Sequence, residues 1–119
     1  MSHHLQKGIL GETIAIEFLQ RSKNYIILER NWRFSHAEID IIAKDGDTLV
    51  FIEVKTRSNI SFGRPEEFVS HKKMSLIQDA ANEFMKTIQH EWAIRFDIVS
   101  IVLNSDGNYE LEHFEDAWW

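Results

Sequence analysis

The sequence predicts a single α/β domain over residues 1–119, built on a mixed β-sheet that helices cover. Two segments with helical spacing of apolar residues, 5–22 and about 65–91, alternate with short runs of β-branched and aromatic residues. The resulting order is helix, three strands, helix and two strands. The chain has 119 residues, the usual length of one domain.

Two amphipathic helices are expected. The first, over residues 5–22, has a broad apolar stripe made of Ile9, Leu10, Ile14, Ile16, Phe18 and Leu19. Glu12 falls between these apolar positions, so its carboxylate would point inward near the start of the helix. The second helix runs over about 65–91 with an interruption near residues 70–71, and its apolar positions are Leu76, Ile77, Ala80, Ala81, Phe84, Met85 and Ile88.

Five strands are expected from runs of β-branched and aromatic residues. They are 24–30, 37–43, 48–55, 94–103 and 109–114. A polar loop over 56–65 follows the third strand directly and is predicted to be a flap or a substrate-contacting loop. Asp97 lies inside an otherwise apolar strand, where a structural role as partner of an arginine or a helix N-terminus is favoured over catalysis.

The hairpin made by the second and third strands carries the most informative residues. Its connection contains Asp-Gly, a strong hairpin signal, and pairing Ala43 with Thr48 sets the register. This register gives two facing pairs at the far end, Asp40 with Phe51 and Glu38 with Glu53. Because side chains alternate along a strand, one face would carry Glu38, Asp40, Ile42, Leu49, Phe51, Glu53 and Lys55, and the other Ile39, Ile41, Val50, Ile52 and Val54.

Three carboxylates and one ammonium group therefore converge at the end of this hairpin, from Glu38, Asp40, Glu53 and Lys55. Like charges facing one another destabilise a sheet, and buried carboxylates are costly unless paired or bound to a metal. A hard cation such as Mg²⁺ would remove the conflict, because it takes carboxylate oxygens and keeps some of its waters. The alternative is a solvated ion-pair cluster at the rim of the sheet, and the presence of Asp40 in register favours the metal site.

The composition excludes several classes of protein. No apolar run approaches the ~20 residues that span a bilayer, and the N-terminus lacks the apolar core of a signal peptide. Cysteine is absent, which excludes disulfides, thiolate metal sites and a cysteine nucleophile. We therefore expect a cytoplasmic protein with no membrane partner. The histidines show no metal-ligand spacing.

The net charge of −6 argues against a simple nucleic-acid-binding protein, whose surface is usually basic. Basic side chains nevertheless gather just after the hairpin, where Lys55 is followed by Arg57, Arg64, Lys72 and Lys73. This basic rim could face phosphate groups while the acidic C-terminal residues point elsewhere. Scattered, solvated charge explains the same sequence equally well.

Several motifs in a fixed order resemble the YraN family of small bacterial proteins. They are Gly11-Glu12, Arg30-Asn31, Glu38-Ile39-Asp40-Ile41-Ile42-Ala43, Val50-Phe51-Ile52-Glu53-Val54-Lys55-Thr56-Arg57, Phe62-Gly63 and Arg95-Phe96-Asp97. That family is similar to Holliday-junction resolvases and to the restriction-endonuclease-like superfamily, whose signature is PD-(D/E)xK. The resemblance covers about residues 7–102 and implies a restriction-endonuclease-like, three-layer α/β/α fold with a central mixed sheet flanked by helices.

The resemblance also implies roles for individual residues. Asp40 matches the metal-binding aspartate of the superfamily, and Glu53 and Lys55 match its (D/E)xK pair. The backbone carbonyl of Val54 would be a further metal ligand. Glu12 sits where resolvase-like members place an acid on the first helix, so it would complete the ligand set.

Other positions carry weaker implications. The residues expected to position backbone phosphates are Arg57, Arg64, Lys72 and Lys73. Lys72 falls where the family pattern has a lysine opening the second long helix. Ile39 stands where the superfamily signature has proline, and Ala37 replaces the glycine usual before the supporting residue Glu38; neither change removes a ligand.

The activity implied is hydrolysis of phosphodiester bonds in DNA, branched DNA included, with Mg²⁺ or Mn²⁺ as cofactor and no organic cofactor. Resemblance to resolvases also implies a homodimer. Two alternatives stay open. One is a non-catalytic nucleic-acid-binding module that acts with partner proteins in DNA recombination or repair. The other is a structural interaction protein that docks or dimerises through residues 114–119.

Overall fold

The computed structural model of the protein describes residues 3–58 and 70–117. Its elements follow the chain in the order α1 (His3–Arg21), β1 (Ile26–Phe34), β2 (Ala37–Asp45), β3 (Thr48–Arg57), α2 (His71–Ile88), β4 (Ile94–Leu103) and β5 (Tyr109–Phe114). The predicted order of helices and strands is confirmed, and the last two strands have the predicted bounds. Within the described residues, neither helix is long and apolar enough to cross a membrane.

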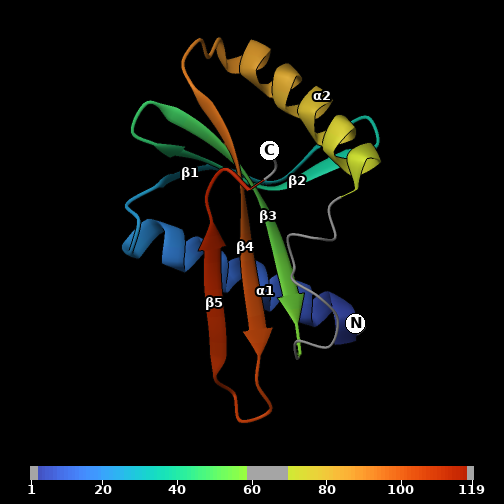
Figure 1. Ribbon diagram of the computed structural model, residues 1–119, viewed down its shortest axis with the longest axis vertical. Coiled ribbons are helices and arrows are strands. Elements are labelled where there is room, and N and C mark those ends of the chain that lie inside the picture. Colours follow the sequence, from blue (N-terminus) through green and yellow to red (C-terminus); the bar gives the residue numbers. More distant parts are fainter. Residues whose placement is uncertain (1–2, 59–69, 118–119) are drawn as a thin grey trace.

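The five strands form one mixed sheet in the order β1-β2-β3-β4-β5. Neighbours are antiparallel except for β3 and β4, which run parallel. A parallel pair needs a long crossover connection, and α2 lies within it. Figure 1 shows α1 crossing behind the sheet and α2 lying at its upper end. The predicted α/β fold with a mixed sheet is confirmed, and it is compatible with a restriction-endonuclease-like fold.

Each face of the sheet has its own apolar core, one under each helix. The buried side chains on the α2 face are Ala37, Ile39, Ile42, Leu49, Phe51, Ile77, Ala80, Ala81, Phe84, Phe96 and Ile98. Those on the α1 face are Ala15, Leu19, Tyr25, Ile41, Ala43, Val50, Ile52, Val99 and Ile101. Strands β2, β3 and β4 contribute to both cores, so the centre of the sheet is packed on both sides. Close packing on both faces therefore fixes the positions of these strands and of the side chains at their ends.

The start of α1 lies very close to the end of β3. A Cβ atom added to Gly11 would be 1.8 Å from Oγ1 of Thr56, so only glycine fits at this crossing. The same approach brings the neighbouring Glu12 beside the end of β3. The predicted apolar stripe of α1 is wrong at Ile9 and Leu10, which are 48% and 49% exposed. The helix instead buries Ala15 and Leu19 against the sheet.

The predicted register of the β2–β3 hairpin is wrong by two residues. Asp45, rather than Ala43, pairs with Thr48, and the connection is a two-residue loop. Gly46 opens this loop with φ of +61°, a conformation that glycine adopts without strain and that suits a tight hairpin. A shift of two residues keeps each side chain on its face but changes its facing partner.

The new register moves the acids of the two strands together. Pairing of β2 with β3 runs from the loop as far as Ile41 and Ile52. One step further, the same register puts Asp40 opposite Glu53 instead of opposite Phe51. The two strands therefore separate at the point where their carboxylates meet.

The alternation of faces along β2 also breaks at Asp40. Ile39 and Ile41 were expected on one face, but Ile39 lies in the core under α2 and Ile41 in the core under α1. The break coincides with the end of pairing to β3, where β2 no longer has to stay in plane with that neighbour. Asp40 consequently lies at the point where β2 and β3 diverge.

Strand β1 is longer than predicted. It continues to Phe34, although the sequence pattern ends near residue 30. Asn31 adopts φ of +51° inside the strand, a conformation that asparagine tolerates better than most residues. The irregular backbone explains why the pattern of strand-forming residues is interrupted there.

Helix α2 begins at the interruption that the sequence predicts near residues 70–71. Its N-cap is Ser70, whose hydroxyl oxygen accepts a hydrogen bond from the backbone N–H of Lys73 at 3.1 Å. The interruption expected near residues 70–71 is therefore the start of the helix. The predicted loop over 56–65 and the helical segment before residue 70 fall mostly within 59–69, outside the described residues.

Candidate functional site

A hollow of about 340 Å³ opens where α1, β2 and β3 meet, and four predicted site residues line it. Glu12 comes from α1, Asp40 from β2, and Glu53 and Lys55 from β3. The remaining lining residues are Lys7, Gly8, Val54 and Thr56. The residues chosen from the sequence as catalytic thus come together in one place.

Asp40 is fixed by the backbone of the neighbouring strand. Its Oδ2 accepts a hydrogen bond from the N–H of Val54 at 2.8 Å. The side chain thereby satisfies a backbone donor where β2 and β3 separate. Burial, and after it the charge of Glu53, raises the pKa of Asp40 to about 7. A carboxylate in this environment would gain from a nearby cation.

Glu53 has the most buried carboxylate in the hollow, with its side chain 8% exposed, and two lysines hold it. Nζ of Lys55 lies 3.4 Å from Oε1 of Glu53. Nζ of Lys73, in the first turn of α2, donates a hydrogen bond to the same oxygen. Burial lowers the pKa of Lys55. Burial acts on Lys73 as well, but its hydrogen bond to Glu53 and the charge of Glu53 outweigh it and leave its pKa raised.

Glu12 faces the same hollow from α1. Burial raises the pKa of Glu12, and the charges of Glu38 and Glu53 act in the same direction. A hydrogen bond with the side chain of Asn31 and the charge of Arg30 oppose this effect. Asn31 is therefore a site residue to which the sequence analysis gave no role. The sequence signal was the Arg30-Asn31 motif itself, which otherwise interrupts a strand.

Lys73, predicted as a phosphate contact, reaches Glu53 in the structure. The spacing along α2 indicates only that Lys73 lies on the side of the helix that faces the sheet. Residues four apart on a helix share a face, and Lys73 precedes the buried Ile77 by one turn. Lys72 lies next to it on the exposed side of the helix. Charge alone does not distinguish Lys72 from Lys73, so the contact with Glu53 was not predicted.

The other predicted residues lie around the hollow or away from it. Glu38 was expected to face Glu53, but its Oε2 lies 2.9 Å from Nε of Arg33 in β1. The register explains the difference, because Arg33 and Glu38 are Cα partners. Arg57 is half-buried at the end of β3. Arg64 lies outside the described residues.

The donor set of the hollow fits a hard divalent cation. Asp40 and Glu53 offer carboxylate oxygens, and Glu12 and Val54 line the same hollow. Among the described residues, no group of three or more His, Cys, Asp or Glu side chains is gathered as a metal site. Mg²⁺ commonly binds through one or two carboxylates and keeps several waters, so it does not require such a group.

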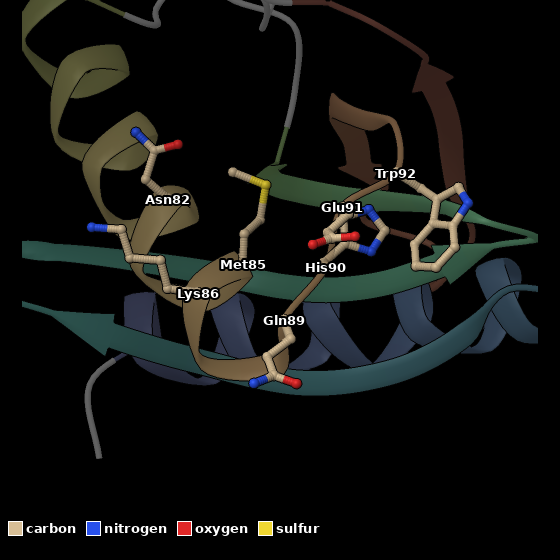
Figure 2. A pocket seen from close by; sticks show the side chains of 7 residues that line it. All are labelled: Asn82, Met85, Lys86, Gln89, His90, Glu91 and Trp92. Carbon is tan, nitrogen blue, oxygen red and sulfur yellow. The ribbon is translucent and has the colours of Figure 1, made fainter.

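A larger hollow of about 780 Å³ lies at the C-terminal end of α2 (Figure 2). It is lined by Asn82, Met85, Lys86, Gln89, His90, Glu91 and Trp92. Figure 2 shows these side chains pointing in different directions rather than toward one centre. Its charged residues, Lys86 and Glu91, are exposed. The smaller hollow, with its buried acids, is therefore the better candidate for chemistry.

A separate buried acid, Asp97 on β4, belongs to a different cluster. Its Oδ1 accepts hydrogen bonds from Nε of Arg95 at 2.8 Å and from the backbone N–H of Asp116 at 3.0 Å. Its Oδ2 lies 2.7 Å from Nε2 of His113. Burial alone would raise the pKa of Asp97, but these hydrogen bonds hold it below its ordinary value. The arginine partner expected from the sequence is present.

Comparison with known proteins identifies the family. The model of the uncharacterised protein family UPF0102 matches residues 11–101. A UPF0102 protein of Flavobacterium psychrophilum is 46% identical over 119 residues, which cover 100% of this chain and 98% of that protein. A UPF0102 protein of Dictyoglomus turgidum is 50% identical over 101 residues, which cover 84% of this chain and 85% of that protein.

Among solved structures, SfsA of Pyrococcus furiosus in complex with Ca²⁺ is similar with a TM-score of 0.36 and 12% identity. The match covers 94% of this chain, and this chain spans 63% of that one. Likeness at this level supports no argument about fold or function. The family model and the relatives agree with the motifs of the sequence: the chain belongs to UPF0102, the YraN-like family.

Proposed function

We propose that this protein is a metal-dependent nuclease that hydrolyses phosphodiester bonds of DNA, branched DNA included. The observation that carries the proposal is the meeting of three acids and a lysine from three elements in one hollow. The pKa values of Glu12 and Asp40 are raised, chiefly by burial. Acids with perturbed pKa values that gather in a hollow mark it as a candidate functional site.

Asp40 and Glu53 would hold Mg²⁺ or Mn²⁺, with Glu12 and the carbonyl of Val54 as further ligands. The bound cation would polarise a phosphoryl oxygen and turn a water molecule into a stronger nucleophile. The N–H of Val54 orients Asp40 for this role through its 2.8 Å hydrogen bond. Two of the proposed ligands, Asp40 and Glu53, lie on the adjacent strands β2 and β3, and the backbone of β3 holds Asp40 in place.

Lys55 would act on the water and on the phosphate. Its ammonium group lies on the same strand as Glu53 and lines the hollow. From there it can donate a hydrogen bond to the attacking water and stabilise negative charge that develops on the phosphoryl oxygens. Burial lowers its pKa, so its Nζ proton is shared more readily with a water than that of an exposed lysine.

Basic residues around the hollow would bind the DNA backbone. Arg57 and Lys72 lie at the end of β3 and at the start of α2, and Arg64 belongs to the segment between them. Contacts to phosphate give affinity and orientation without sequence readout, which suits recognition of DNA shape. A homodimer would present two such hollows to a branched substrate, and sedimentation analysis checks its existence.

The test is cleavage of a four-way DNA junction and of duplex DNA by the purified protein with Mg²⁺ or Mn²⁺. We expect Asp40→Asn and Lys55→Met each to reduce the rate by at least about 10²-fold, the usual effect of losing one group that stabilises the transition state. Asp106→Asn is the matched control, because Asp106 lies in the turn between β4 and β5, away from the hollow. Cleavage that persists in both site variants would overturn the proposal.

A non-catalytic nucleic-acid-binding module, working with partner proteins in DNA recombination or repair, is the second candidate. The observation that favours it is the pairing of Glu53 with two lysines, which neutralises this acid without a metal. Such a module would bind DNA equally well in EDTA and in Mg²⁺, and Asp40→Asn would bind as the wild type does. A metal-dependent nuclease would lose binding or cleavage under the same conditions.

A further inference from the structure

The two lysines that contact Glu53 differ in their freedom to move. Lys55 projects from the central strand β3, and its side chain is 23% exposed. Lys73 projects from the first turn of α2, and its side chain is 38% exposed. Both ammonium groups contact Oε1 of Glu53, whose side chain is 8% exposed. One carboxylate oxygen thus receives two positive charges.

Glu53 needs at least one of these partners. A buried carboxylate without compensation is costly, and the neighbouring carboxylate of Asp40 adds repulsion. A divalent cation at Glu53 would bring twice the charge of an ammonium group to the same region. Two ammonium groups and a divalent cation would then crowd the same carboxylate, and withdrawal of one lysine would relieve their mutual repulsion.

Lys73 is the lysine placed to withdraw. Its long side chain starts at a helix end that Ser70 caps, and its greater exposure gives the ammonium group a route to water. Lys55 is confined by the sheet and by the same carboxylate. Withdrawal of Lys73 therefore costs little solvation and leaves Lys55 in place.

We propose that Lys73 is a positioning residue that holds Oε1 of Glu53 in the metal-free protein, competes with a divalent cation for that oxygen, and releases it when the cation binds. This inference rests on the proposed metal-dependent function. The released ammonium group would stay at the mouth of the hollow, next to Lys72, where a phosphate of the DNA backbone can reach it. This exchange of the Lys73 ammonium group for a divalent cation at Glu53 would link metal binding to DNA binding.

The test compares Lys73→Met with Lys72→Met. Both variants lose one positive charge and keep a side chain of similar length, but only Lys73 contacts Glu53. Mn²⁺ affinity is measured by calorimetry, and stability is measured by urea unfolding in EDTA and in saturating Mn²⁺.

We expect Lys73→Met to bind Mn²⁺ about tenfold more tightly than the wild type, because the cation no longer competes with an ammonium group. Because metal binding and folding are thermodynamically linked, tighter Mn²⁺ binding must appear as a larger stabilisation by Mn²⁺ in urea unfolding. Lys73→Met should be less stable than Lys72→Met in EDTA, and this difference should shrink or vanish in saturating Mn²⁺.

Two different failures can be told apart. Equal or weaker Mn²⁺ binding by Lys73→Met, with a stability deficit that Mn²⁺ does not reduce, would overturn the exchange and leave the proposed nuclease intact. No Mn²⁺ uptake by the wild type and by both variants would overturn the proposed metal-dependent function, and the exchange with it.

Discussion

Two aspartates of the same sheet, the fully buried Asp97 and the half-buried Asp40, have opposite surroundings. Asp97 on β4 is fully buried and receives hydrogen bonds from Arg95 and from a backbone N–H, with His113 at its other oxygen. Asp40 on β2 accepts one backbone hydrogen bond and has Glu53 as a neighbour. The pKa of Asp97 lies below its ordinary value, whereas that of Asp40 rises to about 7.

This is the difference expected between a structural acid and the functional acid that we propose at Asp40. The charge of Asp97 is already compensated by the protein, so this cluster adds stability and needs no ligand. The acids near Asp40 repel one another beside an open hollow of about 340 Å³. Proteins keep such unfavourable arrangements where function requires them.

The largest effect is expected at Asp97. Asp97→Asn removes the charge of a fully buried carboxylate and leaves the half-buried Arg95 only its outer partners Asp45 and Glu115, and breaking a buried ion pair costs roughly 3–5 kcal/mol. Urea unfolding at neutral pH measures the free energy of unfolding. A loss below about 1 kcal/mol would show that the Asp97 cluster contributes little to the fold.

The next largest effect on stability is expected where α1 packs against the end of β3. Gly11→Ala introduces a Cβ into space held by Oγ1 of Thr56, and such overpacking typically costs about 1–3 kcal/mol. Thr56→Ala in the same chain should recover part of the loss, because it removes the nearest atom. Thermal unfolding of the single and double variants checks this, and a fully stable Gly11→Ala would mean that α1 can move away from β3 freely.

A smaller change of opposite sign is expected at Asp40. Asp40→Asn keeps an oxygen that can accept from the N–H of Val54 but removes a charge from the acid hollow. We expect a gain of about 0.5–2 kcal/mol in the absence of metal, the range seen when strain at a functional site is relieved. The same urea experiment as for Asp97 measures it, and a clear loss of stability would place Asp40 among the structural acids.

The smallest effect is expected in how steeply the melting temperature falls as the pH is lowered. Because the pKa of Asp97 is lower in the fold than in the unfolded chain, its contribution is complete above the unfolded value of about 3.9. It is lost as the pH falls below that value and through the lower pKa of the folded state. Melting temperatures from pH 6 to pH 2 should fall less steeply in Asp97→Asn than in the wild type. Parallel curves for the two proteins would contradict this assignment.

Local periodicity in the sequence predicts the order of the elements, whereas the gathering of the site acids was predicted from the hairpin and from the family resemblance together. Glu12, Asp40, Glu53 and Lys55 were chosen from spacing and resemblance, and the fold brings them together. The facing partner of Asp40 could not be found in this way. A tight loop opened by Gly46 competes with a longer one around the same residues, and only the packed strands decide between them.

Residues that join the site through tertiary packing were harder to predict. The contact of Lys73 with Glu53 depends on where α2 starts, which its cap at Ser70 fixes. The contact of Asn31 with Glu12 depends on a positive φ inside a strand, which no periodic pattern signals. Both contacts bring in elements outside the hairpin, so the hairpin alone could not reveal them.

Crystals of the protein soaked in Mn²⁺ test the central claim most directly. Anomalous scattering locates manganese without assumptions about its ligands. We expect one strong peak within bonding distance of carboxylate oxygens from both Asp40 and Glu53. Manganese bound only elsewhere, or no peak at saturating concentration, would contradict the assignment of this hollow as a metal-dependent nuclease centre.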